Sequence, residues 1–531
     1  MRKTAVLFVL LSVVAAGCSY LAGSWLRFGL VDDAYIGMRY ARNWAEGIGP
    51  FFNPDERVEG YTNFLWTFFL YLGACWGAEP PATATLLGIL CIALTVPTTF
   101  LLALNLCRAW VVAVLAVILL ATDTGWWAWS LSGLETPLLT LLFVSAFAIR
   151  LRRSGSLWDS IALSLLAVLA ALTRPEGGAL FLYLFTAAVV KSWFLPRSLV
   201  ERDALRAHVA DLAVLVGVFV AIYLPYLLWR RWTYGLWLPN SFYAKYGFGS
   251  TALVVRGAVY VWRVMAAHPL WSAIPLGLAV GGWRDARFRH LVVFATFFLG
   301  IVGLSGGDHF TLGRFCVPLV PILSVLTANA LQQASLQVSA LRCLAETPGA
   351  RRVLAPAILL IALVLGAMNG SWTFSYRNGG QFHRSEVTWA EAWGWMGRVW
   401  REEVGPDTVV AVTTAGALPY ISSLPAIDIL GINDHHISQR DMPIGGGVAG
   451  HEKGDATYVM QRRPQLVQIA PMLLFQRTPY SEQKVQELFS YPAQWELAAN
   501  PVFEASYEYV TSLTRFGYLS YHRCRTSGRS D

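Results

Sequence analysis

Two adjacent carboxylates, Asp32 and Asp33, follow the first apolar segment of the chain and form the pattern best suited to chemistry. Neighbouring carboxylates can accept a proton from a hydroxyl group or stabilise positive charge that develops during a reaction. They can also simply begin a helix near Ala34, because Asp is favoured at helix N-termini and suits the positive end of the helix dipole. The pair is therefore a candidate catalytic site with a structural alternative.

Other polar and charged residues recur in short segments that separate apolar runs. They are Arg57, Glu59 and Asn63; Glu135; Arg174 and Glu176; Asn240 and Lys245; and Asp308, His309 and Arg314. Charges at membrane depth are costly, so clusters of them on one side of a bilayer imply a polar cavity. Simpler interpretations are a local ion pair of Arg174 with Glu176, a first-turn helix acid at Glu135, and a hydrogen-bonded loop pair of Asp308 with His309.

The composition is that of a membrane protein. Of 531 residues, 55% are hydrophobic and 14% charged, and the mean hydropathy is +0.47, whereas soluble domains are about 25% charged. The Lys and Arg residues form short clusters between apolar runs, so they indicate topology and not the basic stripe of a nucleic-acid partner. Seven cysteines without a CxxC pair indicate neither a disulfide framework nor a zinc site. The groups Asp434-His435-His436 and His451-Glu452 lack HExxH spacing, so we assign no metal ligand.

Eleven apolar segments are candidates to cross a hydrocarbon core of about 30 Å. They lie near residues 5–30, 83–106, 109–123, 135–149, 157–173, 177–194, 208–229, 269–282, 288–305, 316–334 and 353–370. A lipoprotein signal ending at Cys18 is the alternative for the first segment, but apolar character continues to Leu30 and favours an uncleaved helix.

A further apolar segment, 61–76, could either span the membrane or lie along its outer interface, and the positive-inside rule distinguishes the two. If it lies along the outer interface, the basic clusters around Arg152, Lys191, Arg287 and Arg352 all fall in the cytoplasm, whereas a span would place them outside. Its aromatic residues suit the headgroup boundary, so we expect an interfacial helix. Eleven spans from a cytoplasmic N-terminus then leave the C-terminus outside.

These patterns predict a polytopic α-helical membrane protein of two domains. Residues 1–372 would form the transmembrane domain, with an outer loop at 31–82, and residues 373–531 an extracytoplasmic α/β domain. In the latter, an amphipathic helix is expected at 389–404. Strands are expected at 408–412 and 426–430, with a short helix between them, as in the beginning of a βαβ unit.

Several longer motifs occur in order along the chain. They are Asp32-Asp-Ala-Tyr-Ile36, Arg39-Tyr-Ala-Arg-Asn43, Asn53-Pro54, Val58-Glu-Gly-Tyr-Thr-Asn-Phe-Leu-Trp66, Ser132-Gly-Leu-Glu-Thr-Pro137, Thr173-Arg-Pro-Glu-Gly177, Leu238-Pro-Asn-Ser-Phe-Tyr-Ala-Lys245, Gly306-Gly-Asp-His309, Asp428-Ile-Leu-Gly-Ile-Asn-Asp434 and Gly450-His-Glu-Lys-Gly-Asp455. Together they resemble the GT-C superfamily of polyprenyl-phosphate-dependent membrane glycosyltransferases, in particular the AftB-like arabinofuranosyltransferase family. The resemblance is specific for the superfamily and less so for the sugar.

The resemblance implies that a polyprenyl-phosphate sugar donor enters from the lipid bilayer. Its sugar, with arabinofuranose as one candidate, would pass to an extracytoplasmic glycan or glycoconjugate acceptor. The acids of the first outer loop would be catalytic, and because adjacent side chains point in different directions, only one should face the sugar; we prefer Asp32 over Asp33. The other carboxylate could bind a divalent cation or orient the loop, and no other cofactor is expected.

The same resemblance assigns roles to the remaining polar residues. Cations would neutralise the leaving phosphate; the predicted donor-binding residues are Lys245, Arg314, Arg174, Arg57 and His309. The predicted substrate-binding residues are Glu59, Asn63, Glu135, Glu176, Asn240 and Asp308. The expected location is a bacterial inner membrane.

Two alternatives remain at this stage. One is an enzyme of the same superfamily that transfers a hexose or aminosugar to protein or lipid. The other is a transporter or an assembly protein of the envelope without enzymatic activity. Transporters are typically marked by polar residues near mid-membrane and by internal repeats, and this sequence shows neither.

Overall fold

The chain forms two compact units. A computed structural model describes residues 2–152, 156–193, 202–245, 250–268, 270, 274, 277, 282–337, 379–469, 473–474 and 478–525. The first unit comprises residues 1–28, 85–228 and 258–383, and the second comprises 29–84, 229–257 and 384–531. Each unit is assembled from segments far apart in the sequence. The domain boundary expected at 372–373 lies outside the described residues and stays a prediction.

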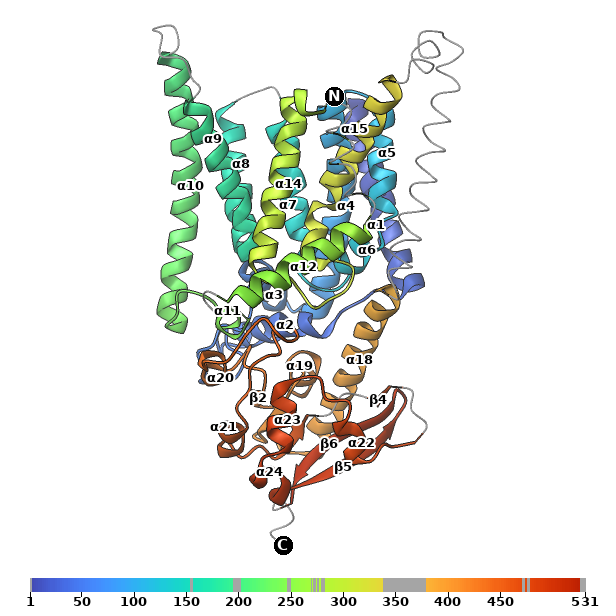
Figure 1. Cartoon of the computed structure of the whole chain (residues 1–531), viewed down its shortest axis with the longest axis vertical. Coiled ribbons are helices and arrows are strands. Elements are labelled where there is room, and N and C mark those ends of the chain that lie inside the picture. The colour runs from blue at the N-terminus through green and yellow to red at the C-terminus, as the bar shows by residue number, and fades with distance from the viewer. Residues whose placement is uncertain are drawn as a thin grey trace. The chain divides into compact units, whose positions relative to one another are not determined.

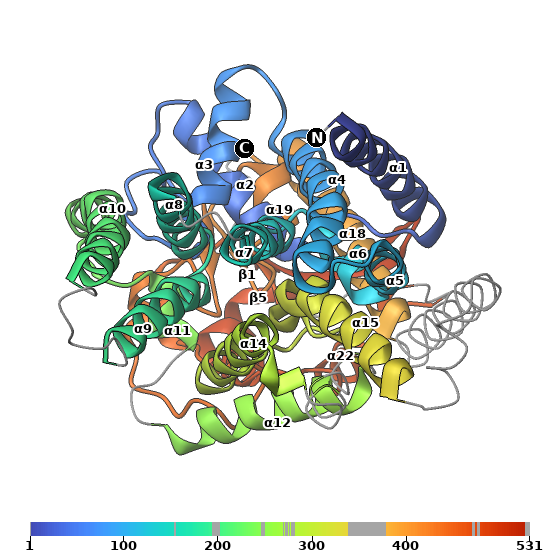
Figure 2. The same ribbon diagram turned by 90° about the horizontal axis from the view of Figure 1, so that it is seen from above.

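The first unit is helical. Its elements are α1 (Arg2–Leu26), α4 (Pro80–Cys107), α5 (Trp110–Ala121), α6 (Thr124–Ser130), α7 (Thr136–Arg150), α8 (Leu157–Thr173), η1 (Pro175–Gly178), α9 (Ala179–Trp193), α10 (Arg202–Tyr234), α12 (Thr251–Ala267), η4 (Gly282–Arg284), α14 (Ala286–Leu304), η5 (Arg314–Leu319) and α15 (Val320–Gln337), of which α4, α10 and α12 extend into the second unit. Figures 1 and 2 show α4, α7, α14 and α15 running alongside one another, with α8, α9 and α10 grouped at one edge.

Nine of the eleven predicted apolar segments coincide with described helices, namely α1, α4, α5, α7, α8, α9, α10, α14 and α15. The segment 353–370 lies outside the described residues, as does most of 269–282. In the described part of the chain, four helices are long and apolar enough to cross a membrane, and α5 with α6, bent by 65°, could form a fifth span. The shorter apolar helices include α7 and α8. The protein is therefore a polytopic membrane protein.

Helix α12 is absent from the predicted segments. Arg256 and Arg263 interrupt its apolar residues, so its sequence lacks the continuous apolar run by which spans are recognised. In the first unit its residues pack on the loop that precedes η5: a Cβ on Gly307 would lie 2.6 Å from the Tyr260 side chain, and one on Gly313 would lie 3.0 Å from Val264. Both glycines also have positive φ. Glycine is therefore favoured at both positions for two reasons: a side chain would clash with α12, and other residues rarely adopt this backbone conformation.

Hydrogen bonds tie several helix ends of the first unit together. Asn105 at the end of α4 donates to the Ala148 carbonyl on α7 (2.9 Å), and Arg287 at the start of α14 donates to the Asn105 carbonyl (2.9 Å). The predicted basic clusters near residues 150 and 287 therefore share one end of the helix bundle, as the positive-inside argument requires.

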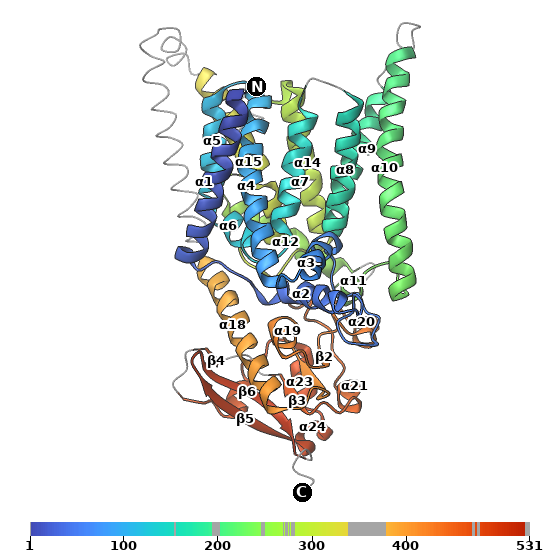
Figure 3. The same ribbon diagram turned by 180° about the vertical axis from the view of Figure 1, so that it is seen from behind.

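The second unit combines helices with a mixed sheet (Figure 3). Its helices are α2 (Asp32–Ala45), α3 (Phe64–Cys75), α11 (Asn240–Lys245), α18 (Gly379–Glu403), α19 (Ala417–Ser422), α20 (His435–Gln439), α21 (Ala456–Gln461), α22 (Glu482–Gln486), α23 (Pro492–Ala498) and α24 (Pro501–Ser506). Its strands are β1 (Val410–Val412), β2 (Ala426–Asp428), β3 (Leu466–Gln468), β4 (Leu473–Leu474), β5 (Tyr507–Thr514) and β6 (Gly517–Cys524).

The sheet has parallel and antiparallel parts. Strand β1 pairs in parallel with β2 (Val410 opposite Ala426) and with β3, while β6 is antiparallel to β3, β4 and β5. The predicted helix at 389–404 and the strand–helix–strand unit at 408–430 are confirmed by α18, β1, α19 and β2.

Apolar side chains cover both faces of this sheet. Val410 and Val412 point into a cluster that contains Tyr40 and Trp400, whereas Ala411 points into a second cluster with Ile427. This alternation is the two-residue period of a strand buried on both faces. Because Tyr40 belongs to α2, the segment that follows the first apolar helix forms part of the core of the C-terminal fold.

We expect Trp400→Ala to destabilise the second unit strongly. The Trp400 side chain is fully buried and meets Tyr521 edge-on at 5.6 Å, and loss of a buried Trp typically costs about 3–5 kcal/mol. Thermal unfolding of the detergent-purified chain measures the effect. Trp495→Ala is the matched control, because this side chain is half exposed; equal melting temperatures for both variants would contradict the packing described.

Candidate active site

The acid pair lies in the first turn of α2, where Val31 occupies the N-cap position. The Asp32 carboxylate accepts hydrogen bonds from the backbone N–H groups of Gly416 (3.2 Å) and Ala417 (2.8 Å), at the start of α19. Its oxygens thus bind the turn between β1 and α19 and do not cap their own helix. Burial raises the pKa of Asp32 to about 7, and the neighbouring charge of Asp33 adds to the shift, while the two backbone hydrogen bonds oppose it.

The position of α2 is fixed by Arg39. Its guanidinium donates to the carbonyls of Phe52 (2.7 Å) and Leu424 (2.8 Å), to that of Pro419, and to the Asn53 side chain (3.1 Å). Asn53 in turn pairs with the backbone of Ala426 in β2. These acceptors are uncharged protein oxygens, so Arg39 anchors the helix to the sheet.

Asp33 acts electrostatically on Tyr491, a residue outside the sequence motifs. Charge on Asp33 and Glu386 adds to burial in raising the pKa of Tyr491. The Tyr491 ring stacks on His451, with centroids 4.4 Å apart and planes inclined by 27°. Gly450, the residue before His451, lies beside Lys245: a Cβ on Gly450 would be 3.0 Å from the Lys245 Cε. In the second unit, Lys245 thus lies beside the residue that precedes His451, and the charge of Asp33 acts on Tyr491, the stacking partner of His451.

Other predicted residues of the second unit make structural contacts. Glu59 forms a buried ion pair with Arg230 (2.8 Å). The Asn240 side chain donates to three carbonyls of the 431–434 turn at 3.0–3.1 Å and accepts from Ser438. Asn63 accepts a hydrogen bond from Thr67, and Arg57 is exposed.

Asp428, at the end of β2, is a second buried acid of the same unit. It accepts backbone hydrogen bonds from Leu430 (3.0 Å) and Asn433 (2.8 Å). Burial raises its pKa to about 6, although these hydrogen bonds lower it. The sequence does not single out Asp428 within its motif, because the burial of this side chain depends on the sheet and not on local spacing.

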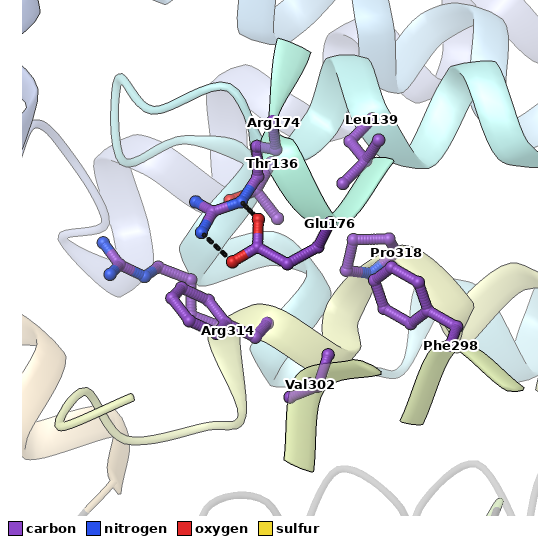
Figure 4. A pocket seen from close by; sticks show the side chains of 9 residues that line it. Thr136, Leu139, Arg174, Glu176, Phe298, Val302, Arg314 and Pro318 are labelled. Atoms are coloured by element: carbon purple, nitrogen blue, oxygen red, sulfur yellow. Dashed lines mark hydrogen bonds and ion pairs between the residues drawn. The ribbon is translucent and has the colours of Figure 1, made fainter. Parts of the chain in front are cut away.

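In the first unit, three predicted motifs converge on one charged network. Arg174 forms ion pairs with Glu135 and with Glu176 (3.1 Å), and Arg314 forms one with Asp308 (2.7 Å). Figure 4 shows Glu176 and Arg174 together with Arg314 around a small cavity of about 10 Å³, enough for about one water. His309 lies next to this network, its Nδ1 3.6 Å from Asp308. The sequence predicted these residues individually, and the fold brings them together.

Aromatic rings cover the guanidinium groups of this network. The Arg174 guanidinium lies 4.3 Å from the centre of the Phe315 ring, and that of Arg314 lies 4.4 Å from Phe310. Such contacts favour a desolvated cation. Within the described residues, no group of three His, Cys, Asp or Glu side chains is arranged to hold a metal ion.

Comparisons with known proteins agree with this architecture. A family described as a domain of unknown function (DUF8728) matches residues 380–522. The terminal β-(1→2)-arabinofuranosyltransferase of Mycobacterium tuberculosis is 29% identical over 292 residues, which cover 51% of this chain and 43% of that relative. The protein of the same name from Corynebacterium glutamicum is 27% identical over 316 residues, covering 53% and 42% respectively. The match thus spans less than half the length of either relative.

A solved structure shows the same fold. The oligosaccharyltransferase of Archaeoglobus fulgidus in the apo form is similar over 96% of this chain and 74% of its own, with a TM-score of 0.51 and 13% sequence identity. The predicted fold, a polytopic GT-C membrane protein with an additional C-terminal domain that contains a sheet, is confirmed, as is the predicted similarity to arabinofuranosyltransferases.

We expect Gly416→Ala to disrupt the acid pair. A Cβ on Gly416 would lie 2.0 Å from the Asp32 carbonyl oxygen and 2.6 Å from its carboxyl carbon, so the turn and α2 would have to separate. The variant should lower both the melting temperature and any activity that depends on the acids. Gly446→Ala is the control, because no atom lies within 4 Å of its Cβ position. A Gly416→Ala protein as stable and active as this control would refute the proposed anchoring.

Proposed function

We propose that this protein is a membrane glycosyltransferase that moves a sugar from a polyprenyl-phosphate donor to an extracytoplasmic glycan. The observation that carries the proposal is the acid pair of α2, in which Asp32 is held by Gly416 and Ala417 while Asp33 lies on the next residue of the helix. The similarity to two terminal arabinofuranosyltransferases supports arabinofuranose as the sugar. The shared GT-C fold supports a donor that enters from the bilayer.

The two acids receive different roles in this proposal. The sequence favours Asp32 as the acid that faces the sugar, but both of its oxygens accept backbone hydrogen bonds, so we reverse that preference and assign Asp32 as the residue that positions α2. Successive side chains on a helix point about 100° apart, so Asp33 faces a different direction and is assigned as the general base. Asp33 would take the proton of the acceptor hydroxyl while the hydroxyl oxygen bonds to the anomeric carbon of the donor sugar. The bond between that carbon and the phosphate oxygen breaks, and polyprenyl phosphate leaves with the electron pair.

Lys245 is assigned to the leaving phosphate. It lies beside Gly450, which precedes His451 in the chain, and His451 stacks on Tyr491, whose pKa the charge of Asp33 helps to raise. Arg174 and Arg314 each face carboxylates, so their charge is already compensated inside the first unit. We assign these two arginines to holding the loops after α8 and before η5 in place.

The acid roles can be separated by conservative substitution. Asp33→Asn should reduce kcat by at least about a hundredfold, the usual contribution of a general base, with an unchanged melting temperature. Asp32→Asn should lower the melting temperature as well, because an amide group would present N–H to one of two N–H donors. Turnover of a synthetic polyprenyl-phosphoryl arabinofuranose by purified protein is the measurement. Asp55→Asn, an exposed acid of the same unit, is the control; full turnover by Asp33→Asn would exclude Asp33 as the base.

The proposed topology places the N-terminus and the end of the bundle near Arg152 in the cytoplasm, with the second unit outside. In a cysteine-free background, Asp55→Cys should react with a membrane-impermeant maleimide in intact spheroplasts, and Arg152→Cys only after the membrane is opened. Both side chains are exposed, so accessibility to solvent does not limit the reaction. The reverse pattern would overturn the orientation.

A further inference from the structure

A second cavity lies in the first unit at the same bundle end as the basic helix termini. It has a volume of about 90 Å³, room for several waters, and lies among α8, α9, α10 and the end of α7. Figures 1–3 show these three helices as neighbours at the edge of the bundle. The polar side chains in its wall are Arg150, Ser160, His208 and Asp211. This cavity is separate from the charged network around Arg174.

Hydrogen bonds hold the three helices around the cavity. Ser160 on α8 donates to the Asp211 carboxylate on α10 (2.7 Å), and the His208 ring on α10 contacts the Ala188 carbonyl on α9 (2.8 Å). These two hydrogen bonds satisfy the polar side chains of Ser160, Asp211 and His208, which lie on otherwise apolar helices. The cavity is therefore a built feature of the helix group.

Two ionisable groups of opposite sign, Asp211 and Arg150, belong to this wall. Asp211 is exposed one turn inside the apolar stretch His208–Tyr234, and its described hydrogen-bond partner is the uncharged Ser160, so its negative charge is not neutralised by that contact. The Nε atom of Arg150 is buried and has no hydrogen-bond partner in the described structure. A ligand that supplies both an anion and a cation would satisfy both groups.

The three helices around the cavity also carry exposed apolar side chains. They are Leu165 on α8, Leu182 and Val190 on α9, and Val209 on α10. Trp158, exposed at the start of α8, is a residue typical of the headgroup level of a bilayer. A molecule bound here would thus have its polar part in the cavity and its apolar part along the helices.

From this placement we propose that the cavity binds the headgroup of a zwitterionic aminophospholipid such as phosphatidylethanolamine. The phosphate pairs with Arg150 and the primary ammonium with Asp211, while the acyl chains lie along α8, α9 and α10. The site does not depend on the proposed glycosyl transfer, and its ligand is a resident lipid, not a substrate.

Lipid retention in native mass spectrometry tests the proposal with the full chain. The wild-type protein, reconstituted in equal mixtures of phosphatidylethanolamine and phosphatidylcholine, should retain the former at least about tenfold more, because a trimethylated ammonium cannot donate a hydrogen bond to Asp211. Equal retention would overturn the proposal without any variant. Preference for phosphatidylglycerol over phosphatidylethanolamine would also overturn it, because the site would then recognise the anion alone.

Matched variants locate the site. Arg150→Gln and Asp211→Asn should each abolish the preference, and Arg150→Lys, which keeps the charge, should retain part of it. Arg152→Gln is the control, because Arg152 is exposed near the same helix end and does not line the cavity. Loss of the preference in the control to the same degree would show general attraction of lipid to a basic surface and would refute the assigned site.

Discussion

The contact on which the second unit depends is the one between the Asp32 carboxylate and the N–H groups of Gly416 and Ala417. It joins residues 384 and 385 positions apart and fixes α2 against the turn between β1 and α19. A buried carboxylate is costly unless hydrogen bonds compensate it, and the rise of its pKa to about 7 shows that burial outweighs the two donors. Gly416 is required there because a side chain would occupy the space that Asp32 fills.

The first unit solves a related problem with ion pairs. Arg174 and Arg314 are largely buried and are compensated by three carboxylates from separate loops, Glu135, Glu176 and Asp308. Removing one member of such a network leaves an uncompensated charge, which costs about 3–5 kcal/mol. The network therefore defines how these loops meet, whatever further role its members have. It also explains why strongly charged motifs occur at the ends of apolar segments.

Much of the fold could be predicted because it is encoded locally. Long apolar runs predicted nine described helices, and the short apolar, Val-rich run at 408–412 predicted β1 as a buried strand. Helix α12 could not be predicted in this way, since Arg256 and Arg263 interrupt its run of apolar residues and its packing partners Gly307 and Gly313 come from a distant loop. For the candidate site, residue types indicated Asp32 and Asp33 as a pair. The hydrogen bonds of Asp32, and the effect of Asp33 on Tyr491, depend on contacts across hundreds of residues that periodicity does not record.

The second unit is assembled from three segments that depend on one another. Residues 229–257 bind both other segments: Arg230 pairs with Glu59, Asn240 holds the 431–434 turn, and Arg256 pairs with Glu452 at 2.8 Å. The donors that hold Asp32 belong to the C-terminal segment, so the acid pair acquires its environment only when that segment has folded. The C-terminal segment is therefore part of the structure that creates the candidate site, and a chain that ended before β1 would contain both acids without the turn that positions them.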